Sequence, residues 1–331
     1  MTAVPTAATP AFDVRTIFRK YGIVVIFLGL CIALSLVSPA FRTIRNLTNV
    51  VRQVSAIGLI SIGVTFCIIC GGIDLSTGSV VGLISVLCAS MAQSRFNPDQ
   101  PISIVMPLVF AILIALAGGA FVGFVNGAIT AYGGIPPFIA TLGMMTVARG
   151  LAELYSGGRP IGLLKDGIIF IGAGSFLGVP VPILIYLVIA VFSWLLLSQS
   201  RFGKHITAIG CNIQAARICG ININRSLIQV YAYCGFLVAI AAIIITGRTA
   251  GGNPAYGLGY ELDAIAATVI GGTSLSGGIG SVPFCVVGAL IIGVINNGMD
   301  LLRINPYWQQ ITKGAIIVIA VLIDARRQKK N

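Results

Sequence analysis

Apolar stretches, most of them long enough for a membrane span, follow one another along nearly the whole chain. A helix needs about 20 mostly apolar residues to cross the hydrocarbon core of a bilayer. Only 9 % of the 331 residues are charged, whereas about 25 % are charged in a soluble domain. A water-soluble fold would therefore have too few polar side chains to cover its surface, and lipid removes that requirement. We expect an all-α, polytopic transmembrane helical bundle.

The apolar stretches predict about ten spans. The eighth is short, and the third and the ninth begin directly after glycine-rich motifs, so eight spans plus re-entrant segments would also fit the pattern. The predicted spans are 21–38, 47–70, 75–93, 104–130, 136–155, 180–198, 226–247, 260–272, 281–299 and 306–324.

Lys and Arg predict the orientation, because they concentrate on the cytoplasmic side of a membrane protein. Basic residues precede the first span, follow the last span and occupy segment 201–225, which has no acidic residue. An even number of spans then places both termini in the cytoplasm. Arg42, Arg45 and Arg52 conflict with this orientation, because it places them outside.

The chain divides into one membrane domain and two short tails. Residues 1–14 are small and rich in Pro and Thr, and we expect them to form a disordered tail. Residues 15–325 are expected to form a single transmembrane domain that includes the cytoplasmic segment 201–225. Residues 326–331 are expected to form a basic cytoplasmic tail.

Missing motifs exclude several function classes. The net charge of +12 is assigned to loops and tails, so no nucleic-acid partner is expected. Cys67 and Cys70 have C-x-x-C spacing, but no second pair and only one histidine, His205, accompany them. We therefore expect no metal site, redox site or cofactor. Neither H-E-x-x-H nor G-x-x-x-x-G-K-[ST] is present, so we predict no catalytic residues and no ATP hydrolysis by this chain.

The chain contains an internal repeat. The segment 71–78, GGIDLSTG, recurs as GGTSLSGG at 271–278, and each copy lies between two apolar stretches. Asn126 and Asn297, each followed by Gly, lie shortly before a proline. We interpret the chain as two weakly related halves, with chance matching in a glycine-rich sequence as the alternative. Transporters commonly have discontinuous helices at corresponding positions of two repeats, next to the substrate path.

Each copy of the repeat predicts a break between two helices. Paired glycines end a helix because they tolerate positive φ, and the Asp or Ser that follows can cap the next helix. Inside a membrane, such a break is tolerated only where it is buried in protein or lines water. Asp74 lies in the first copy. Two roles are open for it: a functional carboxylate at membrane depth, or a structural role as an N-cap or a partner to a nearby helix end.

Three segments carry a resemblance to a known family. They are 71–83 (GGIDLSTGSVVGL), 208–221 (AIGCNIQAARICGI) and 267–280 (ATVIGGTSLSGGIG). With these segments in this order, the chain resembles the permease subunits of bacterial ATP-binding-cassette (ABC) sugar importers of the ribose/xylose/galactose type over nearly its whole length. Cys211 and Cys219 depart from the family pattern, which usually has Gly and Ser there.

The resemblance implies an inner-membrane permease that carries a monosaccharide and leaves ATP hydrolysis to a separate subunit. It implies three partners: a cytoplasmic ABC ATPase, an extracytoplasmic sugar-binding protein, and a second permease that is either a copy or a paralogue. The ATPase would dock on a short coupling helix near 212–220, for which a plain linker is the alternative. The residues expected to carry the coupling are Gly210, Asn212, Ala215, Ala216, Arg217 and Gly220.

A path for sugar should be lined by hydroxyl and amide groups with few charges. The candidates are Asp74, Ser76, Thr77, Asn126, Thr141, Asn296 and Asn297. Each could instead make an interhelical hydrogen bond.

An ion-coupled secondary transporter of a small polar solute is the alternative function. It would need titratable groups at membrane depth, for which the candidates are Asp74, Glu153, Glu261, Asp263 and Asp300. The sequence does not distinguish among sugars, nor does it separate a sugar from a nucleoside or another small solute.

Overall fold

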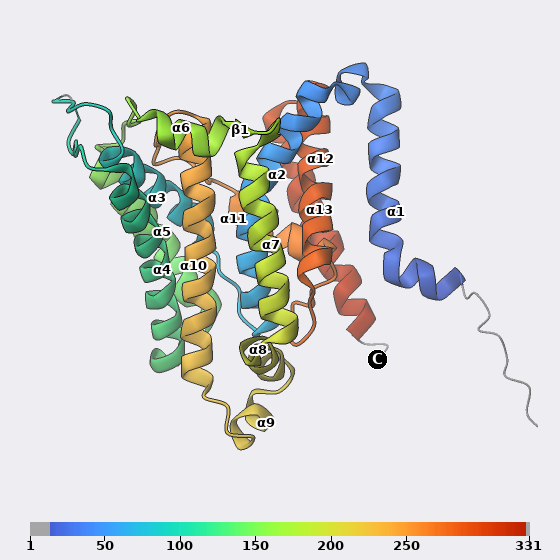
Figure 1. Cartoon of the computed structure of the whole chain (residues 1–331). Coiled ribbons are helices and arrows are strands. Elements are labelled where there is room, and N and C mark those ends of the chain that lie inside the picture. The colour runs from blue at the N-terminus through green and yellow to red at the C-terminus, as the bar shows by residue number, and fades with distance from the viewer. Residues whose placement is uncertain (1–13, 99, 329–331) are drawn as a thin grey trace, which may run out of the picture.

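The computed structural model describes residues 14–98 and 100–328, which form a bundle of helices with one short hairpin (Figure 1). The predicted all-α fold is confirmed. The predicted tail at 1–14 lies outside the described residues except for Val14, where the first helix begins. The predicted tail at 326–331 is described only as far as Gln328, where the last helix ends.

Helices make up most of the described chain. The long helices are α1 (Val14–Val37), α2 (Ile44–Ile69), α4 (Leu108–Gly133), α5 (Pro137–Ser156), α7 (Val181–Gln199), α10 (Ile223–Arg248), α12 (Val282–Leu301) and α13 (Pro306–Gln328). The shorter helices are η1 (Pro39–Arg42), α3 (Thr77–Met91), α6 (Asp166–Ala173), α8 (Arg201–Cys211), α9 (Ile213–Ile218) and α11 (Tyr260–Ile270). The antiparallel hairpin consists of β1 (Ser175–Phe176) and β2 (Val179–Pro180).

A helix lies at each of the ten predicted spans, but not every helix is long enough to cross a membrane. Within the described residues, five helices are long and apolar enough: α2, α4, α7, α10 and α12. Helices α3 and α11, at the third and eighth predicted spans, have only 15 and 11 residues, below the length of about 20 that a span needs. The count of ten therefore stays a prediction, and α3 and α11 have the lengths of re-entrant segments.

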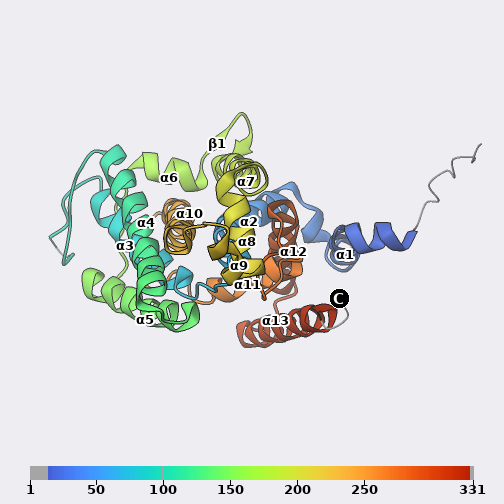
Figure 2. The ribbon, with the colours of Figure 1, turned by 90° about the horizontal axis from the view of Figure 1, so that it is seen from below.

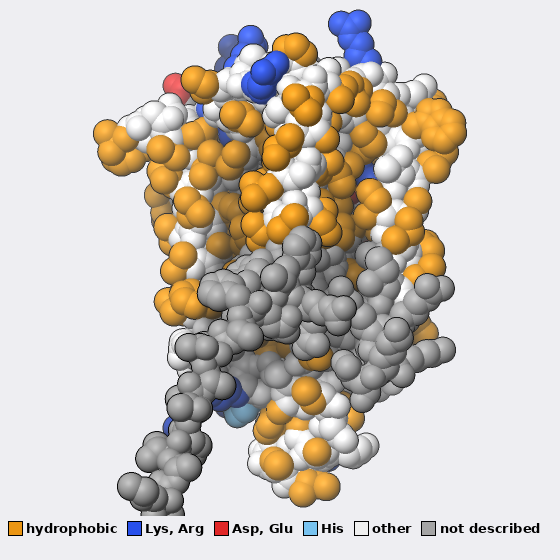
Figure 3. Space-filling model, turned by 90° about the vertical axis from the view of Figure 1, so that its right-hand side faces the viewer, with side chains coloured by type: hydrophobic (Ala, Val, Ile, Leu, Met, Phe, Trp, Pro, Cys, Tyr) orange, Lys and Arg blue, Asp and Glu red, His pale blue; other side chains and the backbone are white. Residues whose placement is uncertain are grey.

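Helices α2 and α10 form the centre of the bundle (Figure 2). Helix α2 packs against α7, α10, α11 and α12, while α10 also packs against α3, α4 and α6. The second half of α2 is fully buried, whereas α4 and α7 expose large side chains such as Phe121 and Phe192. Hydrophobic side chains likewise cover much of the described surface on the side drawn in Figure 3. Such apolar outer surfaces suit contact with lipid.

The two glycine pairs end helices, as the repeat predicts. The residues with positive φ are Gly71, at 85° after α2, and Gly272, at 82° after α11. In each break the next backbone amide donates to a carbonyl five residues earlier, at 2.9 and 3.2 Å. The positive φ falls on the first glycine of 71–72 and on the second of 271–272. The two breaks therefore share a geometry that is offset by one residue from the sequence repeat.

Glycines bring α4 against α10. Gly119, Gly123 and Gly127 all face α10, and a Cβ added at Gly123 would meet the carbonyl oxygen of Tyr231 and lie 3.0 Å from Ala232 Cα. Small residues at this spacing let the backbones of membrane helices approach closely. The contact fixes α10 relative to α4, and both helices line the site described below.

We expect Gly123→Ala to destabilise the protein by about 1–3 kcal/mol, because the added methyl group overpacks a contact between two backbones. The measurement is thermal unfolding of the purified chain in detergent. Gly143→Ala is the matched control, since Gly143 is also helical but has open space around its Cβ position. The packing argument is wrong if the two variants unfold at the same temperature.

Candidate functional site

Asp74 lies in the break between α2 and α3, where its carboxylate accepts hydrogen bonds. Ser76 donates to Asp74 Oδ1 through its backbone N at 2.9 Å and through its Oγ at 2.6 Å. Asn126, on α4, donates through Nδ2 to Ser76 Oγ at 2.9 Å. All three side chains are buried. The break is thus linked to α4 by a chain of three polar groups.

The predicted caps on the helices that follow the breaks are wrong. The Ser76 hydroxyl makes no cap to α3, because it donates to Asp74 instead. After the second break, α12 begins only after Ser281, whose side chain makes no cap either. The two breaks share a local turn instead: Ser276 N donates to Ser274 Oγ at 3.3 Å, in the same positions as Ser76 and Asp74. These side chains therefore stabilise the breaks themselves.

Four candidate path residues line one narrow space. Asp74, Ser76, Thr77 and Asn126 face it together with apolar residues of α3, α4 and α10, and it has no room for a water molecule. Thr77 Oγ1 and Asn126 Oδ1 are buried without a hydrogen-bond partner. Such an atom costs about 1–3 kcal/mol. A hydroxyl group that entered here when the helices part could therefore form hydrogen bonds with both atoms.

The other candidate path residues do not gather at this space. Thr141, on α5, donates to the carbonyl of Ile73 at 3.1 Å and so contacts the first break. Asn297, on α12, and Asn46, on α2, exchange two side-chain hydrogen bonds of 2.9 Å. Asn296 donates to a carboxylate of α11. Asn296 and Asn297 thus connect α12 to α11 and α2, and neither lines the space beside Asp74.

The carboxylate that Asn296 contacts belongs to Asp263, which forms an ion pair with α13. Lys313 Nζ lies 2.9 Å from Asp263 Oδ2, and Asn296 Nδ2 lies 3.4 Å from the same oxygen. The Asp263 side chain is 3 % exposed and that of Lys313 is 27 % exposed. Sequence reasoning found Asp263 but missed Lys313, because nothing in the local pattern pairs two residues on different helices.

The predicted coupling segment forms the helices α8 and α9, which project from one end of the bundle (Figure 1). Asn212 caps α9: its side chain accepts from Gln214 N and Ala215 N, each at 3.0 Å. Ala215 is exposed, whereas Ala216 is buried against its own chain. Within α9, Ala215 is therefore available to a partner and Ala216 is not.

Three of the five exposed residues of α9 are apolar, and Gln214 and Arg217 are the polar ones. Ile213 is 42 % exposed and Ile218 is 87 % exposed, and both lie on the same six-residue helix as Ala215. Arg217 is exposed beside them, and Gly220 ends the segment with a φ of 79°. Apolar side chains grouped on a projecting helix are characteristic of a surface that contacts another protein.

Gly210, near the end of α8, contacts both helix breaks. The amide of Gly278 donates to the carbonyl of Ile69 at 2.8 Å, which joins the second break to the end of α2. A Cβ added at Gly210 would meet this carbonyl oxygen and lie 2.5 Å from Gly278 N. A Cβ at Gly277 would lie 3.1 Å from Gly210 Cα and 3.2 Å from Gly71 Cα. We call Gly71, Gly210, Gly277 and Gly278 the glycine junction.

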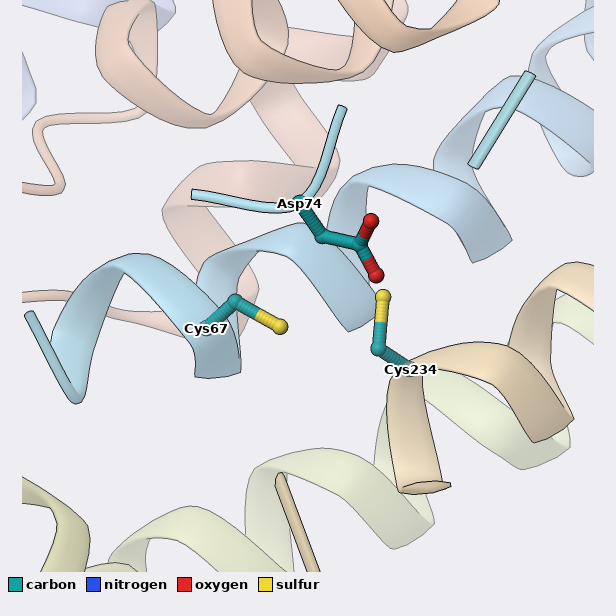
Figure 4. Close-up of side chains that lie close together, drawn as sticks. All are labelled: Cys67, Asp74 and Cys234. Atoms are coloured by element: carbon teal, nitrogen blue, oxygen red, sulfur yellow. The ribbon is translucent and has the colours of Figure 1, made fainter. Parts of the chain in front are cut away.

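The structure also groups two thiols that the sequence does not pair. Cys67 of α2, Cys234 of α10 and Asp74 offer ligand atoms that all lie within 4.8 Å of one another (Figure 4). Cys70, the neighbour in the C-x-x-C spacing, is not part of this group. Spacing along the chain could not identify the partner, because it comes from a different helix.

Comparison with known proteins finds transport permeases in each case. The family described as "branched-chain amino acid transport system / permease component" matches residues 46–321. The chain is similar to the ribose import permease protein of Haemophilus influenzae, with 42 % identity over 305 residues, 90 % of this chain and 91 % of that protein. The corresponding protein of Bacillus subtilis is 42 % identical over 306 residues, 91 % and 92 % of the two chains.

A second group of similar proteins is named for another sugar. The galactose/methyl galactoside import permease protein of Escherichia coli is 41 % identical over 327 residues, which cover 96 % of this chain and 97 % of that protein. No solved structure matches the chain.

We expect Lys313→Met to destabilise the protein by about 2 kcal/mol, because it leaves the buried carboxylate of Asp263 without its cation. The partial exposure of Lys313 keeps this value below that of a fully buried pair. The measurement is thermal unfolding in detergent. The double variant Lys313→Met with Asp263→Asn should recover most of the loss, since it removes both charges; a double variant less stable than Lys313→Met alone would contradict the explanation.

Proposed function

This chain belongs to the permease-component family named above, and we propose on that premise that it is the permease subunit of an ABC importer that carries a monosaccharide across the inner membrane. The observation that carries the proposal is the similarity to sugar import permeases at 41–42 % identity over at least 90 % of this chain. In this proposal, a separate subunit hydrolyses ATP and this chain forms the path.

The chemistry beside Asp74 supports a sugar as the substrate. A sugar hydroxyl both donates and accepts hydrogen bonds, so it can pair with the unsatisfied Thr77 Oγ1 and Asn126 Oδ1. We infer that the path passes this space when α3 separates from α4 and α10, with Thr141 supporting the break from α5. Ribose and galactose are the sugars to test first, because the relatives are named for them.

The exposed face of α9 supports docking of an ABC ATPase there. Ile213, Ala215 and Ile218 offer apolar surface to a partner, and Arg217 adds a cation that can pair with an acidic group. Asn212 fixes the helix by capping it. A short helix that lays apolar residues into a groove is a common mode of protein recognition.

The glycine junction supports a route by which movement of α9 reaches the path. Helix α9 follows α8 directly, and Gly210 of α8 contacts the backbone at both breaks. Asp74 lies three residues beyond Gly71 of the junction. Contacts between backbones leave little room for independent movement. We therefore propose that a displacement of α8 and α9 shifts both breaks together.

The remaining partners follow from the same proposal. An extracytoplasmic binding protein would deliver the sugar at the end of the bundle opposite α9, and a second permease, a copy or a paralogue, would complete the complex. The beginning of α1 and the end of α13 lie toward the same end of the molecule as α9 (Figure 1). This placement supports cytoplasmic positions for both ends.

We expect Ala215→Arg to lower ATP-dependent sugar uptake by at least about tenfold, because an unpaired guanidinium would have to be buried in the docking surface. The measurement is uptake of labelled ribose and galactose by vesicles that contain this chain, its ATPase and its binding protein. The ATPase should also be lost from the purified complex. Gln199→Arg is the control, since Gln199 is exposed at the end of α7 and lies outside α9.

Two results would contradict the proposal. Uptake that proceeds without the ATPase and follows an ion gradient would identify a secondary transporter instead. Retention of the ATPase by Ala215→Arg, with normal uptake, would move the docking site away from α9.

We expect Gly210→Val to uncouple ATP hydrolysis from sugar transport. The ATPase should stay bound, because α9 is unchanged, while uptake per ATP hydrolysed falls, because the new side chain pushes α8 away from the carbonyl of Ile69. The measurement compares uptake with ATP hydrolysis in the same vesicles. Gly143→Val is the control. Equal ratios in the two variants would rule out transmission through the junction.

A further inference from the structure

The two thiols in the group formed by Cys67, Asp74 and Cys234 have no role in the function proposed above. The three side chains come from α2, from the first break and from α10, and they point toward one another in Figure 4. Each is at most 2 % exposed. All three ligand atoms lie within 4.8 Å of one another.

The geometry and the ligand types fit one class of ligand. Thiolate sulfurs select soft or borderline cations such as Zn²⁺ and Cu⁺ over Mg²⁺ and Ca²⁺. A tetrahedral ion bound at about 2.3 Å by two sulfurs holds them about 3.8 Å apart, about 1 Å below the limit of 4.8 Å within which the ligand atoms of the group already lie. We propose that Cys67, Asp74 and Cys234 form a binding site for a thiophilic metal cation.

Unsatisfied polar atoms beside the group provide a second observation. Asn126 Oδ1 is fully buried without a partner, and its side chain lines the same space as Asp74. Tyr231 lies one turn before Cys234 on α10, and its buried hydroxyl also lacks a partner. That hydroxyl lies against Gly72, two residues before Asp74. An ion bound by the group would offer these oxygens an interaction they lack.

Charge balance allows the ion to enter a buried site. When a divalent cation binds, the thiols of Cys67 and Cys234 each release a proton, and the metal takes their place. With Asp74 as carboxylate, the group has the same net charge before and after binding. Burial therefore adds no uncompensated charge. Because the ligands come from three separate elements, the ion would hold α2, the first break and α10 together.

The test uses the full-length chain in lipid nanodiscs with Cd²⁺ as the probe. Cys211 and Cys219 are exposed, so both are first changed to Ser in a parent variant to remove their background binding. We expect the parent to bind one Cd²⁺ per chain, with ultraviolet absorption from sulfur-to-cadmium charge transfer. Bound Cd²⁺ should also raise the unfolding temperature, since it stabilises the folded state.

Two variants of the parent decide the outcome. Cys67→Ala and Cys234→Ala should each weaken Cd²⁺ binding by more than about tenfold and lose the stabilisation. Cys70→Ala is the matched control, because Cys70 is buried on the same stretch as Cys67 but lies outside the group. Unchanged binding in Cys67→Ala or Cys234→Ala overturns the proposal, and so does equal weakening in Cys70→Ala. These readouts need no transport, so they are independent of the proposed function.

Discussion

The structure depends on how backbone polar groups are satisfied where two helices break inside an apolar bundle. Lipid offers no hydrogen bonds, so each break must find its partners within the protein. Each helix end first folds back on itself through a left-handed glycine. The carbonyl of Ile69 at the end of α2 then accepts from the amide of Gly278 in the other break. The two breaks thus satisfy each other, and neither can be removed without leaving the other incomplete.

This mutual contact explains why the predicted coupling segment, which forms α8 and α9, is connected to the centre of the bundle. Backbones that bond to each other must approach closely, and only glycine leaves room for a third backbone beside them. Gly210 fills that room, so α8 ends against the two breaks. Three of the polar residues that line this space, Asp74, Ser76 and Thr77, follow Gly71 closely in the chain. One set of contacts therefore joins the projecting helix α9 to the residues proposed for the path.

Local patterns in the sequence predicted the features that depend on neighbouring residues in the chain. Hydropathy located the helices at the predicted spans, and glycine pairs located both breaks. The caps assigned to Ser76 and to the helix after the second break were wrong, because a short polar side chain can bond within a turn as well as to a helix. Pairs between helices were not predictable: Cys67 with Cys234, and Lys313 with Asp263, depend on packing that spacing along the chain does not encode.

The distribution of charge explains why this bundle suits an external source of energy. A group that couples transport to an ion must exchange partners as the protein changes conformation. Asp263 is instead paired with Lys313 and bonded to Asn296, and Asp74 accepts from Ser76 within the same turn. Ser76 moves with Asp74, whereas the partners of Asp263 lie on α12 and α13. Both carboxylates therefore already have partners within the protein. The contacts that do join separate parts of the path are the uncharged backbone contacts of the glycine junction. In the function proposed here, these contacts would transmit a displacement supplied by a docked ATPase.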